Sequence, residues 1–192
     1  MTLPNRLTIG RLGLTVLFVA CFSLPIAGRY GWALGLFLVA VVTDYLDGEI
    51  ARRWSLTTDF GKLMDPLADK ILTASAFICL LGVEKGGTAA ITAWAVIVIV
   101  SREFLITGLR LLASSKGIIL PAERLGKHKT AWQMITILYF LTLLAIFHYL
   151  PPHWAQPAWN VGAYGLVPIT VLLTIYSGAA YMVKNRHLVA HA

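Results

Sequence analysis

The chain has 192 residues, of which 58% are hydrophobic and 13% charged, with a formal net charge of +7 and a mean hydropathy of +0.74. Soluble domains carry charged residues at about a quarter of their positions, so this chain has too few to cover a water-facing surface. The composition excludes a soluble protein and indicates one membrane domain over residues 1–192, with no room for a second, soluble domain.

Six apolar stretches predict six transmembrane helices, because most of them approach the roughly 20 residues needed to span a bilayer. They cover about residues 12–27, 30–47, 63–83, 88–112, 131–150 and 159–183. Before the first stretch, LPNRLTIGR (residues 3–11) mixes apolar and polar side chains and predicts a short interfacial segment. A signal peptide is the less favoured alternative for this end of the chain. The predicted fold class is therefore an all-α, polytopic membrane protein.

The lysines and arginines predict the orientation of these helices. Six spans would put both termini on one side, together with fourteen of the sixteen cations, and would leave only Arg29 and Lys85 on the other side. This bias predicts that both termini, residues 44–70 and residues 102–130 face the cytoplasm. Topology and anionic lipid account for most of the positive charge, which gives no indication of a nucleic-acid partner.

The stretch DYLDGEIARRWSLTTDFGKLMDPLADK (residues 44–70) joins the second and third apolar stretches and holds six of the nine acidic residues. On a helix with about 100° per residue, Asp44 and Asp47 lie within about 60° of each other. Asp65 and Asp69, four residues apart, share a face of the next helix. A tight turn would therefore bring four carboxylates together at the cytoplasmic boundary.

Four carboxylates at close range repel one another, so a divalent cation is expected to neutralise them. Their hard oxygen ligands suit Mg²⁺, Mn²⁺ or Ca²⁺, as one ion or two. Gly48 and Ala51 lie on the face of Asp44 and Asp47 and leave room for a ligand, while Arg52 offers two donors for a phosphate. Helix capping is the alternative for single aspartates, and it is the favoured interpretation of Asp59.

The spacing Asp44-x-x-Asp47-Gly48-x-x-Ala51-Arg52, followed after eight residues by Gly61-x-x-x-Asp65-x-x-x-Asp69, resembles the signature of the CDP-alcohol phosphotransferase family throughout. The blocks LPNRLTIGR, SREFLITGLRLL (101–112) and LGKHKTAWQM (125–134) resemble the bacterial members that use glycerol 3-phosphate as the acceptor.

This resemblance implies a membrane enzyme, usually a homodimer, that transfers a phosphatidyl group from CDP-diacylglycerol to an alcohol and releases CMP. It implies a cofactor, Mg²⁺ or Mn²⁺, held by Asp44, Asp47 and Asp65. Asp69 would be a further ligand or neighbour of the metal and the general base for the acceptor hydroxyl. The residues implied in binding CDP-diacylglycerol are Asn5, Thr8, Gly48, Ala51, Arg52 and Gly61.

A charged acceptor such as glycerol 3-phosphate would need cations of its own, and the flanking blocks supply Arg102, Arg110, Lys127 and Lys129. Arginine after a long apolar run is costly and is usually paired or functional. We expect Glu103 to be a poor partner for Arg102, because adjacent helical residues point in different directions. The alternative for all four cations is that they reach out to lipid headgroups.

Other functions remain open from the sequence. The same chemistry could use inositol phosphate, serine or phosphatidylglycerol as the acceptor. A divalent-cation transporter could use the same aspartates, although it would want carboxylates near the middle of the membrane. A structural scaffold would leave the aspartates unexplained. In the last outer loop, Tyr149, Trp154 and Trp159 are predicted to form an aromatic belt at the membrane interface.

Overall fold

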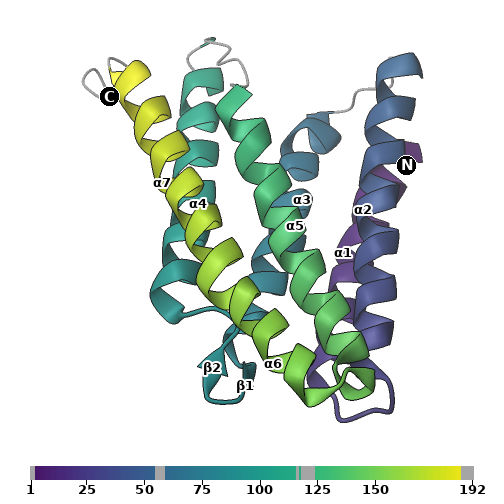
Figure 1. Ribbon diagram of the computed structural model, residues 1–192. Helices are drawn as coiled ribbons and strands as arrows, with labels where there is room; N and C mark the ends of the chain where they lie inside the picture. The colour runs from purple at the N-terminus through teal and green to yellow at the C-terminus, as the bar shows by residue number, and fades with distance from the viewer. Residues whose placement is uncertain (1–2, 55–58, 116, 118–123, 187–192) are drawn as a thin grey trace.

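A computed structural model shows the chain as one bundle of long helices, with a small hairpin at one end (Figure 1). The structure describes residues 3–54, 59–115, 117 and 124–186. Within these ranges, side chains are described except at residues 3–8, 45–54, 59–66, 69, 115, 124, 125, 148 and 152.

The predicted apolar stretches correspond to six long helices. These are α1 (Leu3–Ser23), α2 (Arg29–Trp54), α3 (Asp59–Leu81), α4 (Ala93–Ser115), α5 (Arg124–Ile146) and α7 (Val167–Lys184). The short elements are β1 (Glu84–Lys85), β2 (Thr88–Ala89), the 3₁₀ turn Phe147–Tyr149, α6 (Pro152–Val161) and the π-helical turn η2 (Gly162–Leu166). The predicted interfacial segment is continuous with the first helix, so α1 begins at Leu3.

The hairpin was not predicted from hydropathy, because residues 88–112 form one apolar stretch. In the structure β1 pairs antiparallel with β2, and the turn between them holds Gly86 and Gly87 at φ values of +54° and +76°. Glycine adopts this left-handed backbone without steric cost. The helix that follows therefore begins only at Ala93.

Aromatic and small side chains interlock along the middle of the bundle. Helix α1 packs on α2 and α3, α5 packs on α2, α3 and α7, and α4 packs on α3 and α7. Phe18 and Phe37 are fully buried with ring centroids 5.7 Å apart, and alanines at 33, 40 and 76 let the helices approach closely. This core holds the ends of α3, α4, α5 and α7 in a fixed relation.

Helices α6 and α7 run into each other through the π-helical turn η2. A Cβ atom at Gly162 would lie 2.8 Å from ring atoms of Tyr139 and Phe140, so glycine allows this turn to approach α5. Trp159 packs edge-on against Phe140 and is fully buried, and its Nε1 donates to the Thr88 carbonyl oxygen at 2.9 Å. The prediction that Trp159 lies at the membrane interface is wrong, whereas Tyr149 and Trp154 are exposed.

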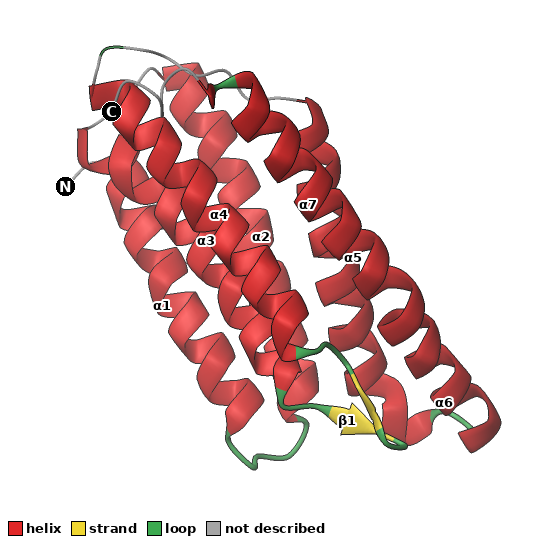
Figure 2. Ribbon diagram, turned by 90° about the vertical axis from the view of Figure 1, so that its left-hand side faces the viewer, coloured by secondary structure: helices red, strands yellow, loops and turns green. Residues whose placement is uncertain are grey.

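Different elements lie at the two ends of the bundle. Helix α1 begins and α7 ends at the same end, and the hairpin and α6 lie at the other (Figure 2). Among the described residues, Gly126–Ile146 and His153–Lys184 are long and apolar enough to cross a membrane, and Ile9–Ser23 and Lys70–Leu81 are shorter apolar helices.

Candidate functional site

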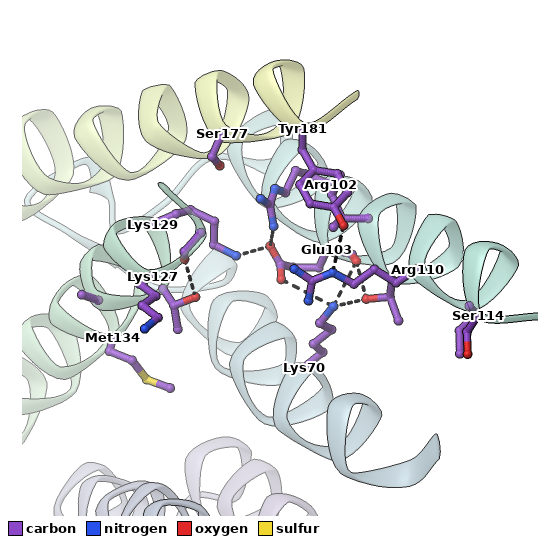
Figure 3. A pocket seen from close by; sticks show the side chains of 16 residues that line it. Lys70, Arg102, Glu103, Arg110, Ser114, Lys127, Lys129, Met134, Ser177 and Tyr181 are labelled. Carbon is purple, nitrogen blue, oxygen red and sulfur yellow. Dashed lines mark hydrogen bonds and ion pairs between the residues drawn. The ribbon is translucent and has the colours of Figure 1, made fainter. Parts of the chain in front are cut away.

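A pocket of about 680 Å³ lies between α3, α4, α5 and α7 (Figure 3). All four cations that the sequence singled out for the acceptor line it, although they come from two separate blocks of the chain. The charged residues of the pocket wall are Lys70, Arg102, Glu103, Arg110, Lys127 and Lys129. Five cations against one carboxylate make this pocket suited to an anion.

Glu103 lies at the centre of these charges. Its Oε1 forms ion pairs with Lys129 Nζ and, at 3.3 Å, with an Arg102 guanidinium nitrogen. Its Oε2 lies 4.0 Å from Lys70 Nζ. The prediction that Glu103 is a poor partner for Arg102 is therefore wrong. Long side chains can bend around the helix and meet, even though the Cα–Cβ bonds of neighbours diverge.

Lys129 is only 2% exposed, so its ammonium group points into the bundle rather than out to lipid headgroups. The lipid-facing alternative is thus excluded for this residue. Lys127 also lines the pocket, but its side chain is exposed, so it can reach either a ligand or a lipid headgroup.

Lys70, which the sequence did not single out, brings α3 into the pocket. Its Nζ donates to the Thr107 hydroxyl and to the Glu103 carbonyl oxygen at 3.3 Å, while Thr107 in turn donates to the same carbonyl at 2.8 Å. Lys70 directly follows Asp69 of the signature. The pocket and the aspartate-rich segment therefore share the first half of α3.

The side chain of Arg102, on α4, lies against the surface of α7 at Gly178. A Cβ atom at Gly178 would lie 2.9 Å from Arg102 Cγ, so any larger residue there would push the arginine away. The buried Nε of Arg102 has no hydrogen-bond acceptor among the described residues.

Arg110 is held by α7 as well. Its Nε donates to the Tyr181 hydroxyl at 3.2 Å, and its guanidinium lies 5.4 Å from the centre of that ring. Tyr181 itself is buried in a small apolar cluster with Ile106, Leu109 and Ala113. The arginine is exposed on one side, so it is held in place but remains accessible to a ligand.

Of the four signature aspartates, only Asp44 has a described side chain. Its Oδ1 lies 2.6 Å from a guanidinium nitrogen of Arg11, which is 2% exposed, while the Asp44 side chain is 44% exposed. Sequence reasoning treated Arg11 only as a topological charge. Its position at the end of the predicted interfacial segment gave no sign that its side chain would reach from α1 to Asp44 of α2.

The other predicted residues around the aspartates lie in described helices, but their side chains fall outside the described part. Asn5 and Thr8 are in α1, Asp47, Gly48, Ala51 and Arg52 in α2, and Gly61, Asp65 and Asp69 in α3. Among the described side chains there is no group of three or more potential metal ligands, and that set contains only one of the four aspartates. Convergence of the carboxylates therefore stays a prediction.

An apolar helical bundle with a cationic pocket beside an aspartate-rich pair of helices is the arrangement expected of a membrane protein that binds anionic ligands. The chain belongs to the CDP-alcohol phosphatidyltransferase family, which it matches over residues 1–176.

Three relatives each cover at least 95% of the chain. A CDP-diacylglycerol–glycerol-3-phosphate 3-phosphatidyltransferase of Bacillus subtilis is 36% identical over 198 residues, covering 95% of this chain and 94% of the relative. A Pseudomonas fluorescens protein of the same name is 34% identical over 185 residues, covering 95% and 89%. A cardiolipin synthase (CMP-forming) of Oryza sativa is 34% identical over 194 residues, covering 96% of this chain and 57% of the relative.

Proposed function

We propose that the protein transfers a phosphatidyl group from CDP-diacylglycerol to glycerol 3-phosphate, giving phosphatidylglycerophosphate and CMP. The observation that carries this proposal is the pocket, in which five cations surround one carboxylate beside the signature helix α3. A phosphomonoester dianion matches that charge, and glycerol 3-phosphate is small enough for a cavity of about 680 Å³.

The proposed reaction needs a nucleophile, a base and a leaving group. The acceptor hydroxyl attacks the phosphorus atom that carries diacylglycerol, the bond from that phosphorus to the bridging oxygen of the pyrophosphate breaks, and CMP leaves with the bond electrons. Asp69 takes the hydroxyl proton as the general base. The pocket would hold the acceptor by its phosphate, so that the hydroxyl is oriented toward the aspartates of α2 and α3.

The carboxylates of the four signature aspartates suit a divalent cation. Carboxylate oxygens are the ligands that Mg²⁺ and Mn²⁺ prefer, and the one described aspartate, Asp44, keeps its side chain 44% exposed although Arg11 contacts it. We propose Asp44, Asp47 and Asp65 as ligands, with Asp69 as a ligand or neighbour. The ion would stabilise negative charge on the pyrophosphate and on departing CMP.

The aspartate segment also bears the proposed site for CDP-diacylglycerol. Arg52 would bind the pyrophosphate, the small residues Gly48, Ala51 and Gly61 would leave space for the nucleotide, and Asn5 and Thr8 of α1 would help to hold it. Support comes from the family assignment and from the placement of these residues in three neighbouring helices, because α1 packs on both α2 and α3.

A second acceptor is favoured by one comparison. The rice relative is named a cardiolipin synthase (CMP-forming). We propose phosphatidylglycerol as the second acceptor for such chemistry. Its phosphodiester carries one negative charge, which leaves more of the pocket's positive charge uncompensated. Family membership argues for a transferase and against a divalent-cation transporter. The competing hypotheses therefore differ only in the acceptor, which would be phosphatidylglycerol, inositol phosphate or serine.

We further propose that all six long helices span a bacterial cytoplasmic membrane and that the protein forms a homodimer. The start of α1, the end of α2, the start of α3 and the end of α7 lie at the same end of the bundle (Figure 1), which would be the cytoplasmic end. Water-soluble glycerol 3-phosphate would then reach the pocket from the cytoplasm, while the acyl chains of the donor stay in the bilayer.

Replacing Arg110 by alanine should raise the KM for glycerol 3-phosphate about ten- to hundredfold, because a charge-assisted contact of about 1.5–3 kcal/mol is lost. Arg102→Ala should act in the same direction, and the KM for CDP-diacylglycerol should change little in both. Initial rates of CMP release with either substrate varied give both constants.

The matched control is Arg29→Ala. Arg29 is an arginine at the opposite end of the bundle, where it donates to the Tyr30 hydroxyl at 2.7 Å. It should leave both KM values unchanged. If Arg110→Ala raised only the KM for CDP-diacylglycerol, the arginine would belong to the donor site and the assignment of the pocket to the acceptor would be wrong.

A further inference from the structure

The pocket wall contains one charge of the wrong sign for an anion site. Glu103 is the single carboxylate among the described residues that line the pocket, and its side chain is 13% exposed. It contacts cations from three helices: Lys70 of α3, Arg102 of α4 and Lys129 of α5. Figure 3 shows these three side chains converging on it.

We propose that Glu103 is a positioning residue for the acceptor pocket, which holds Lys70, Arg102 and Lys129 in the arrangement that binds the acceptor phosphate. This inference rests on the function proposed above and deepens it. Glu103 does not contact the acceptor; it acts through the three cations. The acceptor class that such a pocket selects is a phosphomonoester dianion.

The physical need for this carboxylate follows from the burial of its partners. Lys129 is 2% exposed, and Lys70 and Arg102 are 17% and 14% exposed, so water screens their mutual repulsion poorly. A negative charge between them offsets that repulsion. Without it, the long side chains would turn apart, and ligand binding would have to overcome their conformational entropy.

The other two cations of the pocket do not pair with Glu103 among the described residues. Arg110 and Lys127 are exposed, and no ion pair is found between either of them and Glu103 in the described part of the chain. The pocket therefore has three cations that pair with Glu103 and are at most 17% exposed, and two exposed cations that do not pair with it. One carboxylate leaves a net charge of +4 on the five cations, counted from the lining residues, which still attracts a dianion.

The backbone of Glu103 takes part in the same arrangement. Its carbonyl oxygen accepts from Lys70 Nζ at 3.3 Å and from the Thr107 hydroxyl at 2.8 Å, and Lys70 also donates to that hydroxyl. Lys70 is thus held by one turn of α4. Because Asp69 precedes Lys70 on α3, fixing Lys70 also fixes the distance between the acceptor pocket and the signature segment.

The deciding experiment compares Glu103→Gln with Glu84→Gln, a matched change at an exposed glutamate of β1 at the opposite end of the bundle. Both purified variants are assayed for CMP release with glycerol 3-phosphate and CDP-diacylglycerol varied in turn. We expect Glu103→Gln to raise the KM for glycerol 3-phosphate about ten- to hundredfold. Its KM for CDP-diacylglycerol should stay within about threefold of wild type, as should both constants of Glu84→Gln.

Two other outcomes would overturn the proposal. If Glu103 only competed with the phosphate for the cations, its removal would lower the KM for glycerol 3-phosphate. If it served folding alone, Glu103→Gln would lower the thermal unfolding temperature but leave both KM values unchanged.

A double-mutant cycle tests whether Glu103 acts through Lys129. The KM effect of Glu103→Gln combined with Lys129→Met should fall well below the product of the two single effects, because both changes disrupt one arrangement. Independent, multiplying effects would contradict the positioning role. If Glu103→Gln does not fold, Thr107→Val replaces it, with an expected rise of about three- to tenfold; an unchanged KM would count against the proposal.

Two results distinguish an error in the proposed function from an error in the role of Glu103. If the wild-type protein released no CMP with glycerol 3-phosphate, the function itself would be wrong. If the wild type were active and Glu103→Gln behaved like Glu84→Gln, only the role of Glu103 would be wrong.

Discussion

Replacing Asp69 by asparagine should lower turnover by about 10²–10⁴-fold, the usual contribution of a general base, while CDP-diacylglycerol still binds. Asparagine keeps the shape of the side chain but cannot accept the proton of the acceptor hydroxyl. Single-turnover CMP release at saturating glycerol 3-phosphate measures the chemical step, and equilibrium binding of labelled CDP-diacylglycerol measures the donor site separately.

Asp59→Asn is the matched control for this prediction. Asp59 is the first residue of α3 and the sequence favours it as a helix cap, so its replacement should leave turnover within about threefold of wild type. Turnover of Asp69→Asn within the same threefold range would remove Asp69 from the role of general base. A loss of donor binding equal to the loss of rate would instead make it a binding residue.

Removal of divalent metal should abolish CMP release, and added Mg²⁺ or Mn²⁺ should restore it. Each of Asp44→Asn, Asp47→Asn and Asp65→Asn should then raise the metal concentration needed for half-maximal activity, because each variant has one anionic ligand fewer. The thermal unfolding temperature, measured as a function of metal concentration, checks the same weakening of metal binding without relying on activity. Full activity with an unchanged titration in all three variants would refute the ligand assignment.

Asp44 needs one additional control, because it also forms an ion pair with the buried Arg11. Arg11→Gln removes the partner and keeps the aspartate. If metal dependence changes in Asp44→Asn but not in Arg11→Gln, the effect belongs to the carboxylate rather than to a disturbed contact between α1 and α2.

Hydropathy predicted the six long helices because each of them contains a long apolar stretch, which is visible in the local sequence. Helix α2 ends at Trp54, seven residues past the apolar stretch 30–47, and α3 begins at Asp59, four residues before the stretch 63–83. The polar residues of the signature segment extend both helices, as expected for a segment that places its aspartates on helix faces. Hydropathy could not predict the hairpin before α4, because Gly86 and Gly87 turn the chain through backbone conformations that an apolar average does not register. Trp159 was misassigned for a related reason: its burial depends on Phe140 of α5 and the Thr88 carbonyl, both distant in sequence.

The pocket was predictable in part. Residue type and resemblance selected Arg102, Arg110, Lys127 and Lys129, and the structure brings them together. The role of Glu103 was missed because its strongest partner, Lys129, is 26 residues away on another helix. Lys70 was missed because a lysine after the last signature aspartate looks like any other cytoplasmic charge.

These two omissions share one physical cause. Helical periodicity gives the direction of a Cα–Cβ bond, but lysine, arginine and glutamate carry their charges several bonds further out. Where four helices meet, such charges are placed by packing between helices, which one segment of sequence does not contain. Arg102 illustrates this, since it reaches its position only because α7 offers Gly178 under its side chain.

Under the proposed function, the protein joins a phosphatidyl group to a phosphorylated acceptor. The most direct measurement is CMP release from labelled CDP-diacylglycerol by the purified wild-type protein with Mg²⁺, comparing glycerol 3-phosphate with glycerol, serine, inositol phosphate and phosphatidylglycerol. We predict rapid CMP release and a phosphatidylglycerophosphate product with glycerol 3-phosphate, and at most slow release with phosphate-free glycerol. Equal release with glycerol and glycerol 3-phosphate, or none with any acceptor, would contradict the account.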